Sequence, residues 1–225
     1  MKIKIMITLI VGLSMLMMIS CESGDDFSPS SDAYNTQVLS QIDETILAFP
    51  ADSLSEDEVA GLLLMREEEK LARDVYIHLY ETWGLRIFNN IAASEATHMY
   101  ALKVLLDRYE LEDPILQDVM GEFANEKLAG LYASMTVSGD SSLTNALLVG
   151  ATIEDLDIYD LMELTEETDN EDILYAYDNL TRGSRNHIRS FVSQLNRNNL
   201  VYNPQFISAS LLDSILDTPK EKGSW

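Results

Sequence analysis

The sequence predicts an all-α protein, a four-helix bundle with a long crossover between helices 2 and 3. Apolar residues recur at intervals of three and four, which is the spacing of one helical face, and strand-like alternation is nearly absent. Four long segments show this spacing, and a connection over residues 115–140 separates the second segment from the third. Two helical hairpins joined by such a crossover form a four-helix bundle.

The first half of the predicted fold has clear helix boundaries. Apolar residues within 38–47 predict a short leading helix that ends near Pro50. The run Ser55-Glu56-Asp57-Glu58 is a capping box, so the first long helix begins there. That helix should continue to about Thr82, because Gly84 suits the position just after a helix.

The second long helix covers roughly residues 87–110 and stops before Asp113-Pro114. Within the crossover we expect one short helix over about 126–135, broken by Ser138-Gly139-Asp140.

The third long helix should begin at Ser141 or Ser142 and end near Leu164. The fourth follows Thr168-Asp169-Asn170, whose side chains can cap it, and reaches about Leu195. The remaining tail is only loosely amphipathic.

The N-terminus has the pattern of a bacterial lipoprotein signal peptide. Lys2 and Lys4 precede an apolar run over residues 5–19, which is too short for a stable membrane span. Ser20-Cys21 at the end of this run resembles a lipobox, so Cys21 is expected to become the first mature residue and to carry a lipid. The protein would then lie in the cell envelope, outside the cytoplasm and attached to the membrane by that lipid. The alternative is an ordinary secretory signal with a chance cysteine.

We therefore expect a signal peptide over residues 1–20, a polar tether with the leading helix over 21–53, the bundle over 54–200 and a tail over 201–225. Without the signal peptide, 13 basic residues face 38 acidic ones, a net charge of −25. Such a surface repels nucleic acid and anionic lipid headgroups, so no nucleic-acid partner is expected. Cys21 is the only cysteine, which excludes a disulfide within the chain and a multi-thiolate metal site.

A carboxylate and an imidazole share one apolar face of the second long helix. Glu95 and His98 are three residues apart, so their side chains lie on the same side of a helix. The residues around them on that face are apolar, including Phe88, Ile91 and Leu102. Burying such polar groups is unfavourable unless something compensates them, and a bound metal ion would do so.

The other long helices supply similar groups. Glu154 falls within the apolar stripe of the third helix, with Asp157 one turn later, and His187 falls within the stripe of the fourth. The first helix is ambiguous, because Glu68 and Glu69 both border its apolar stripe. Glu67 points the same way as Lys70, Asp74 and His78, which are expected to face water.

The four segments resemble the metal-ligand helices of rubrerythrins and ferritins. Glu69 precedes Tyr76 by seven positions, as the first ligand does in that superfamily, and this selects Glu69 over Glu68. Glu95 and His98 match the Glu-x-x-His of the second helix, Glu154 the third ligand helix and His187 the fourth. The whole stretch from Val59 to Phe191 is similar to an uncharacterised ferritin-like family of bacteria and archaea.

The resemblance implies a function at these five positions. Two non-haem iron ions would be held by Glu69, Glu95, His98, Glu154 and His187, with manganese or zinc as alternatives. Glu95 and Glu154 would bridge, and Tyr76 would form a hydrogen bond beside the ligands. The expected chemistry is oxidation of Fe(II) by oxygen or peroxide, or reduction of peroxide. A homodimer is compatible with this prediction, whereas the lipid tether would hinder closed cages.

One departure from the family pattern leaves an alternative open. Ser184 stands where the second Glu-x-x-His would have its carboxylate, so water or Asp157 would have to complete one metal ion. A lopsided site would instead hold one ion firmly and the second weakly. The alternative function is a non-enzymatic lipoprotein that sequesters metal or binds a partner.

Overall fold

Helices account for all the regular structure in the part of the chain that the computed structural model describes, residues 36–223. Seven helices and no strands occur within these residues, so the all-α prediction is confirmed. Their bounds are α1 Thr36–Ile46, α2 Glu56–Trp83, α3 Arg86–Arg108, α4 Glu126–Asp140, α5 Leu143–Glu166, α6 Glu171–Arg197 and α7 Ala209–Leu216.

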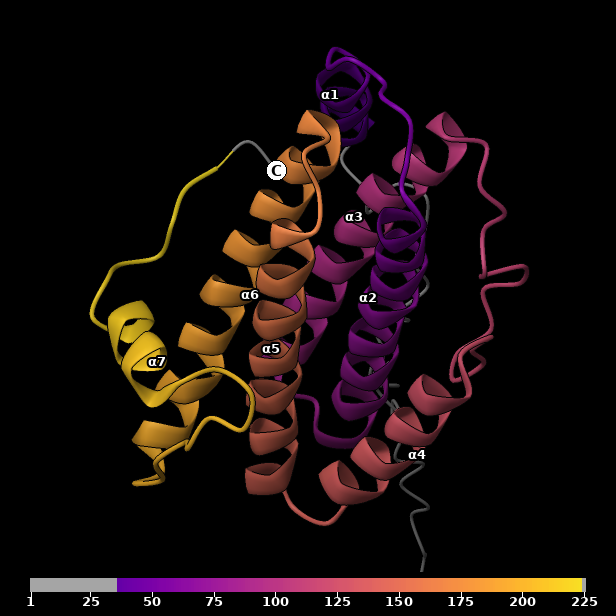
Figure 1. Ribbon diagram of the computed structural model, residues 1–225. Helices are drawn as coiled ribbons and strands as arrows, with labels where there is room; N and C mark the ends of the chain where they lie inside the picture. Colours follow the sequence, from indigo (N-terminus) through magenta and orange to yellow (C-terminus); the bar gives the residue numbers. More distant parts are fainter. Residues whose placement is uncertain (1–35, 224–225) are drawn as a thin grey trace, which may run out of the picture.

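The four long helices α2, α3, α5 and α6 lie side by side (Figure 1). Helix α2 packs mainly on α3, and α5 mainly on α6, while contacts of α2 with α5 and of α3 with α6 join the two pairs. Helix α4 packs against α2 and α5, and α1 packs against α3. None of the described helices is long and apolar enough to cross a membrane. The predicted signal peptide and Cys21 lie outside the described residues.

The ends of α2 agree with the sequence prediction. Ser55 accepts a hydrogen bond from the Glu58 backbone N–H, and the Glu58 side chain accepts one from the Ser55 N–H, which completes the capping box. Gly84 follows the helix with φ of 63°, a conformation that is strained for residues with a Cβ. At α6, Asn170 occupies the N-cap position, but its side chain donates to Glu58 Oε1 at 2.7 Å instead of capping the helix.

The prediction that Ser138-Gly139-Asp140 breaks the crossover helix was wrong. Helix α4 continues through these residues to Asp140. A Cβ at Gly139 would lie 2.5 Å from Leu79 Cδ2, so the absence of a side chain allows α4 to approach α2 closely. The indole N–H of Trp83 also donates to the Gly139 carbonyl at 3.0 Å. Close packing therefore outweighs the low helix propensity of glycine here.

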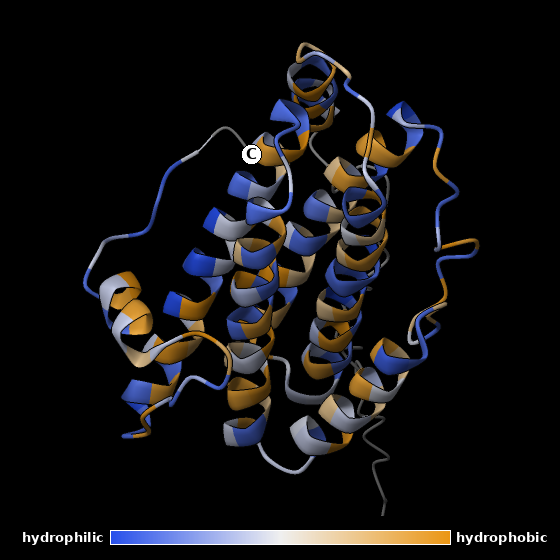
Figure 2. Ribbon diagram, viewed as in Figure 1, coloured by the Kyte–Doolittle hydropathy of each residue, from blue (hydrophilic) through white to orange (hydrophobic). Residues whose placement is uncertain are grey.

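The apolar core consists of two clusters. One contains Val75 of α2, Phe88 of α3, Ala151 of α5 and Phe191 of α6, and the other includes Met65, Leu102, Leu161 and Leu180 of the same four helices. Figure 2 shows hydrophilic stretches interrupting the hydrophobic ones along these helices. On α2, α3 and α6 a polar segment separates the two clusters, whereas on α5 the polar residues Glu154, Asp155 and Asp157 lie between Ile153 and Ile158 of the first cluster.

The prediction that Glu67, Lys70 and Asp74 face water was also wrong, because the crossover covers them. Glu67 accepts hydrogen bonds from the backbone N–H groups of Ala124 and Asn125, at the start of α4. Lys70 Nζ donates to the Val119 carbonyl at 2.7 Å and to Asp74 Oδ2 at 2.5 Å. The polar side of α2 thus binds the backbone of the crossover.

The residues after α6 also pack on the long helices. Asp155 of α5 is fully buried, and it accepts hydrogen bonds from the Tyr202 hydroxyl at 2.8 Å and the Ile207 backbone N–H at 2.9 Å. The segment between α6 and α7 is thereby attached to α5.

Two lysine–aspartate pairs with the same i,i+4 spacing provide a test of the buried layer. The side chains of Lys70 and Asp74 are 0% and 1% exposed, whereas those of Lys103 and Asp107 are 44% and 64% exposed. Asp74→Ala would leave Lys70 buried without its charged partner, so we expect a loss of about 3–5 kcal/mol in unfolding free energy. Asp107→Ala should change it by less than about 1 kcal/mol.

Urea denaturation of both variants measures this difference. Equal effects of the two substitutions would contradict the buried role of Asp74.

Candidate metal centre

The structure brings the five predicted ligands together between the two apolar clusters. They come from four helices: Glu69 from α2, Glu95 and His98 from α3, Glu154 from α5 and His187 from α6. Their exposed fractions are 1%, 1%, 3%, 0% and 9%, in the same order. Carboxylates and imidazoles are rarely buried this deeply without partners, so what compensates them is the central question about this site.

The first group of potential ligands joins α2 and α3. His98 Nδ1 lies 2.7 Å from Glu95 Oε2 and 3.1 Å from Glu69 Oε2. Glu69, Glu95 and His98 each offer one atom to a set whose members lie within 4.8 Å of one another.

The second group joins α3, α5 and α6. His187 Nδ1 lies 2.9 Å from Glu95 Oε1 and 3.3 Å from Glu154 Oε2. The two imidazole rings stack with their centroids 5.8 Å apart. Glu95 belongs to both groups, with one carboxylate oxygen beside each imidazole, whereas Glu154 belongs only to the second.

Several of these atoms lack the partner that buried polar atoms normally have. Glu69 Oε1, Glu95 Oε1, Glu154 Oε2 and His187 Nδ1 are buried and form no hydrogen bond. Although His187 Nδ1 and Glu95 Oε1 are close, their orientation does not make a hydrogen bond. Unsatisfied groups are uncommon in native proteins, and here they converge on one place. A cation bound among them would satisfy all four, so the residues fit a metal ion.

Tyr76 holds one of the potential ligands in place. Its hydroxyl donates to Glu154 Oε1 at 2.5 Å and also lies 3.2 Å from the Gly150 carbonyl. Its ring packs against Phe88 and Phe191 in the adjacent apolar cluster. One oxygen of Glu154 is therefore fixed by Tyr76, and the other remains available.

Gly183 has a role that the sequence analysis missed. A Cβ at this position of α6 would lie 2.6 Å from His98 Nε2 and 2.5 Å from His98 Cε1. Only a residue without a side chain therefore lets α6 pass beside the His98 imidazole. A glycine inside a long helix, four residues before His187, is the signal that could have revealed it.

The two candidates left open on the first helix occupy different places. Glu69 is in the first group, whereas Glu68 lies beside Asp160 of α5, and its Oε2 is buried without a partner. Asp157 is buried nearby but belongs to neither group. Ser184 donates its hydroxyl to the Leu180 carbonyl of its own helix at 3.1 Å. His78 lies outside the cluster and contacts Asp140 at 2.7 Å.

Electrostatics shows how the site is compensated without a metal ion. Burial raises the pKa of Glu69 and of Glu154 to about 7. Burial lowers the pKa of His98, but Glu69 and Glu95 outweigh it and raise the value to about 10. For Glu95, burial is opposed by His187 and His98, which hold its pKa well below the usual range. In the absence of metal, protonated imidazoles thus neutralise Glu95, and protons neutralise part of the remaining charge.

Fold and site together define an all-helical protein with a buried carboxylate–imidazole centre that could hold cations. The chain belongs to the family described as an uncharacterized protein domain, DUF2202, which matches residues 58–219.

Relatives of this chain include an archaeal protein. The uncharacterized protein MJ0754 of Methanocaldococcus jannaschii is 51% identical over 180 residues, covering 80% of this chain and 97% of the relative. A crystal structure of the hypothetical protein MJ0754 from Methanococcus jannaschii matches with a TM-score of 0.76 and 52% identity, covering 76% of this chain and 98% of that one.

The raised pKa values predict how the stability of the metal-free protein depends on pH. Glu69 and Glu154 bind protons more tightly in the folded state, so the stability that they contribute is full below their usual pKa of 4.5 and is lost as pH rises through about 7. The pKa of His98 is raised from its usual 6.5 to about 10, so the stability that His98 contributes is also lost as pH rises through this range. We expect the melting temperature to fall between about pH 5 and about pH 10.

Melting curves of the chelator-treated protein test this expectation. Glu69→Gln should flatten the fall, and Glu166→Gln, which alters an exposed carboxyl on α5, should leave it unchanged. An unaltered fall in Glu69→Gln would contradict this account of the site.

Proposed function

We propose that the chain is a ferritin-like protein that holds two non-haem metal ions, iron in the first place, and oxidises Fe(II) or reduces peroxide. The observation that carries this proposal is the position of Glu95, whose two oxygens each face a different imidazole within one buried cluster. A carboxylate shared in this way suits a bridge between two adjacent cations. The other four potential ligands form two pairs: Glu69 and His98 would hold one ion, and Glu154 and His187 would hold the other.

The donor types favour particular metals. Three carboxylates and two imidazoles are hard oxygen and borderline nitrogen ligands, which suit iron or manganese and also accept zinc. Two iron ions, when bound, would exchange electrons with oxygen or peroxide. The chain contributes the surroundings: the apolar clusters exclude water from both sides, and Tyr76 orients Glu154.

The arrangement of helices supports the ferritin-like part of the proposal. The long helices α2, α3, α5 and α6 provide Glu, Glu-x-x-His, Glu and His in chain order, and the crossover with α4 joins α3 to α5. Ferritin-like di-iron proteins place their ligands on facing helices in the same way. Lipid attachment through Cys21 on the outer side of a membrane remains a prediction from the sequence.

Ser184 favours a second candidate function. Its hydroxyl donates to the Leu180 carbonyl of the same helix. Because position 184 is a serine, α6 provides no carboxylate one turn before His187. A centre that lacks this carboxylate would sequester metal without turning over oxygen or peroxide. The two functions differ in whether loading with Fe(II) leads to oxygen or peroxide consumption.

Metal analysis of protein purified without chelator tests the proposal. We expect about two ions per chain, as in di-iron bundles. Glu95→Gln should abolish binding of both ions because it removes the shared carboxylate charge, whereas Glu69→Gln should weaken mainly the His98 side. The exposed Glu166→Gln is the matched control.

A wild-type chain that takes up no iron, manganese or zinc, and whose melting temperature none of them changes, would overturn the proposal. Two bound irons without consumption of oxygen or peroxide would instead favour sequestration.

Two buried tyrosines allow the orienting role of Tyr76 to be tested. Tyr76 donates to Glu154, whereas the Tyr177 hydroxyl is buried without a partner. Tyr76→Phe should lower metal affinity about 10–100-fold, because groups that orient ligands typically contribute that much. Tyr177→Phe removes the same atom and should leave the affinity unchanged. Competition with a metal indicator measures both, and equal affinities would show that Tyr76 does not orient the ligand.

A further inference from the structure

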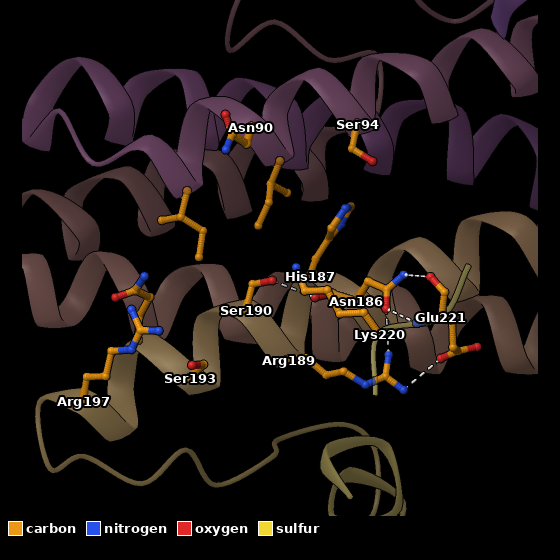
Figure 3. Close-up of a pocket in the computed structure, with 13 residues that line it drawn as sticks. Asn90, Ser94, Asn186, His187, Arg189, Ser190, Ser193, Arg197, Lys220 and Glu221 are labelled. Carbon is orange, nitrogen blue, oxygen red and sulfur yellow. Dashed lines mark hydrogen bonds and ion pairs between the residues drawn. The ribbon is translucent and has the colours of Figure 1, made fainter. Parts of the chain in front are cut away.

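A pocket of about 650 Å³ lies between α3, α6 and the C-terminal segment. Figure 3 shows His187 extending from α6 toward α3, where Asn90 and Ser94 lie. Most of the lining side chains are polar. The full lining is Ile87, Asn90, Ile91, Ser94, Asn186, His187, Arg189, Ser190, Ser193, Gln194, Arg197, Lys220 and Glu221.

This pocket reaches the proposed metal centre at one residue. Of the five clustered ligands, only His187 lines the pocket, and it is also the most exposed of them at 9%. The other four lie behind it with exposed fractions of 3% or less. A molecule in the pocket would therefore approach the His187 side of the centre.

The volume indicates the size of that molecule. Oxygen and peroxide are close to water in size, and water occupies about 30 Å³ in the liquid. Pockets of about 300–1,000 Å³ are typical of sites for organic ligands. The pocket is thus much larger than either small oxidant requires.

The charged residues that line the pocket indicate the chemistry of the molecule that would bind there. The chain carries a formal charge of −23, yet this pocket is lined by Arg189, Arg197 and Lys220 with Glu221 as the only acid. Glu221 is already paired, at 2.6 Å with Arg185 and at 2.9 Å with Arg189. Arg197 and Lys220 are exposed and form no ion pair with any residue between 36 and 223.

The wall that holds Lys220 is itself fixed. Arg189 donates to the Ile215 carbonyl and to the Thr218 hydroxyl, both at 2.8 Å, as well as to Glu221. Asn186 adds a bond to the Glu221 carbonyl at 3.0 Å. Arg189 is occupied in attaching the segment to α6, which leaves Arg197 and Lys220 as the cations available to a ligand.

We propose that this pocket binds a small organic anion, with carboxylate or phosphate groups contacting Arg197 and Lys220 and its body beside His187. The inference rests on the proposed function, because the metal centre that the anion would approach is part of that proposal. The hydroxyl group of Ser193 and the amide group of Asn90 would supply further hydrogen bonds to an oxyanion.

Titration of the full chain with citrate, inorganic phosphate and neutral glycerol at constant pH tests this inference. Binding is followed by nitrogen NMR of the three histidines. We expect a saturable shift of the His187 signals with citrate or phosphate, no shift with glycerol, and no shift of His78, which lies far along α2 beside Asp140.

The double variant Arg197→Gln, Lys220→Gln should bind at least about tenfold more weakly. Lys127→Gln, which alters an exposed lysine of α4, should bind normally.

The measurement is made on metal-free and on zinc-treated protein. If none of iron, manganese and zinc binds in the metal analysis but the anion shifts His187, the proposed function fails and the pocket assignment stands. If zinc binds but neither anion shifts His187, or if the double variant binds as well as the parent, the pocket assignment fails.

Discussion

The rest of the structure depends on the compensation of three carboxylates and two imidazoles buried midway along four helices. Apolar packing is interrupted there, since the two core clusters lie on either side of these residues. Without metal, the charges are balanced by protonated imidazoles around Glu95 and by protons on Glu69 and Glu154. This balance leaves four buried atoms without partners, and cations would satisfy them. The helices must keep their register for the groups to meet at all.

A second buried polar layer lies on the other side of α2. Glu67, Lys70 and Asp74 bind backbone groups of the crossover and the start of α4. Because Glu69 projects from the same helix turn, the crossover contacts also fix the orientation of α2 toward the centre. The two layers differ in one respect: the crossover layer is fully paired within the chain, whereas the central cluster has open positions.

Much of the centre could be predicted because its residues break an apolar repeat. Glu95, His98, Glu154 and His187 stand where helical spacing calls for apolar side chains, so burial followed from periodicity alone. The same reasoning failed for Lys70 and Asp74, since periodicity treats a polar face as solvent-facing and cannot foresee a crossover that covers it. The roles of Gly139 and Gly183 depend on Leu79 and His98 in other helices, and the pocket depends on a tail with little pattern of its own.

Gly183 has a wider consequence for the dimensions of the centre. Because the His98 imidazole rests against the backbone of α6, the gap between α3 and α6 at this level is set by main-chain atoms. A main-chain surface has no rotamers to change. The proposed metal centre is accordingly rigid where His98 meets α6, so adjustment of its donor atoms to an ion would come from the carboxylate side chains of α2 and α5.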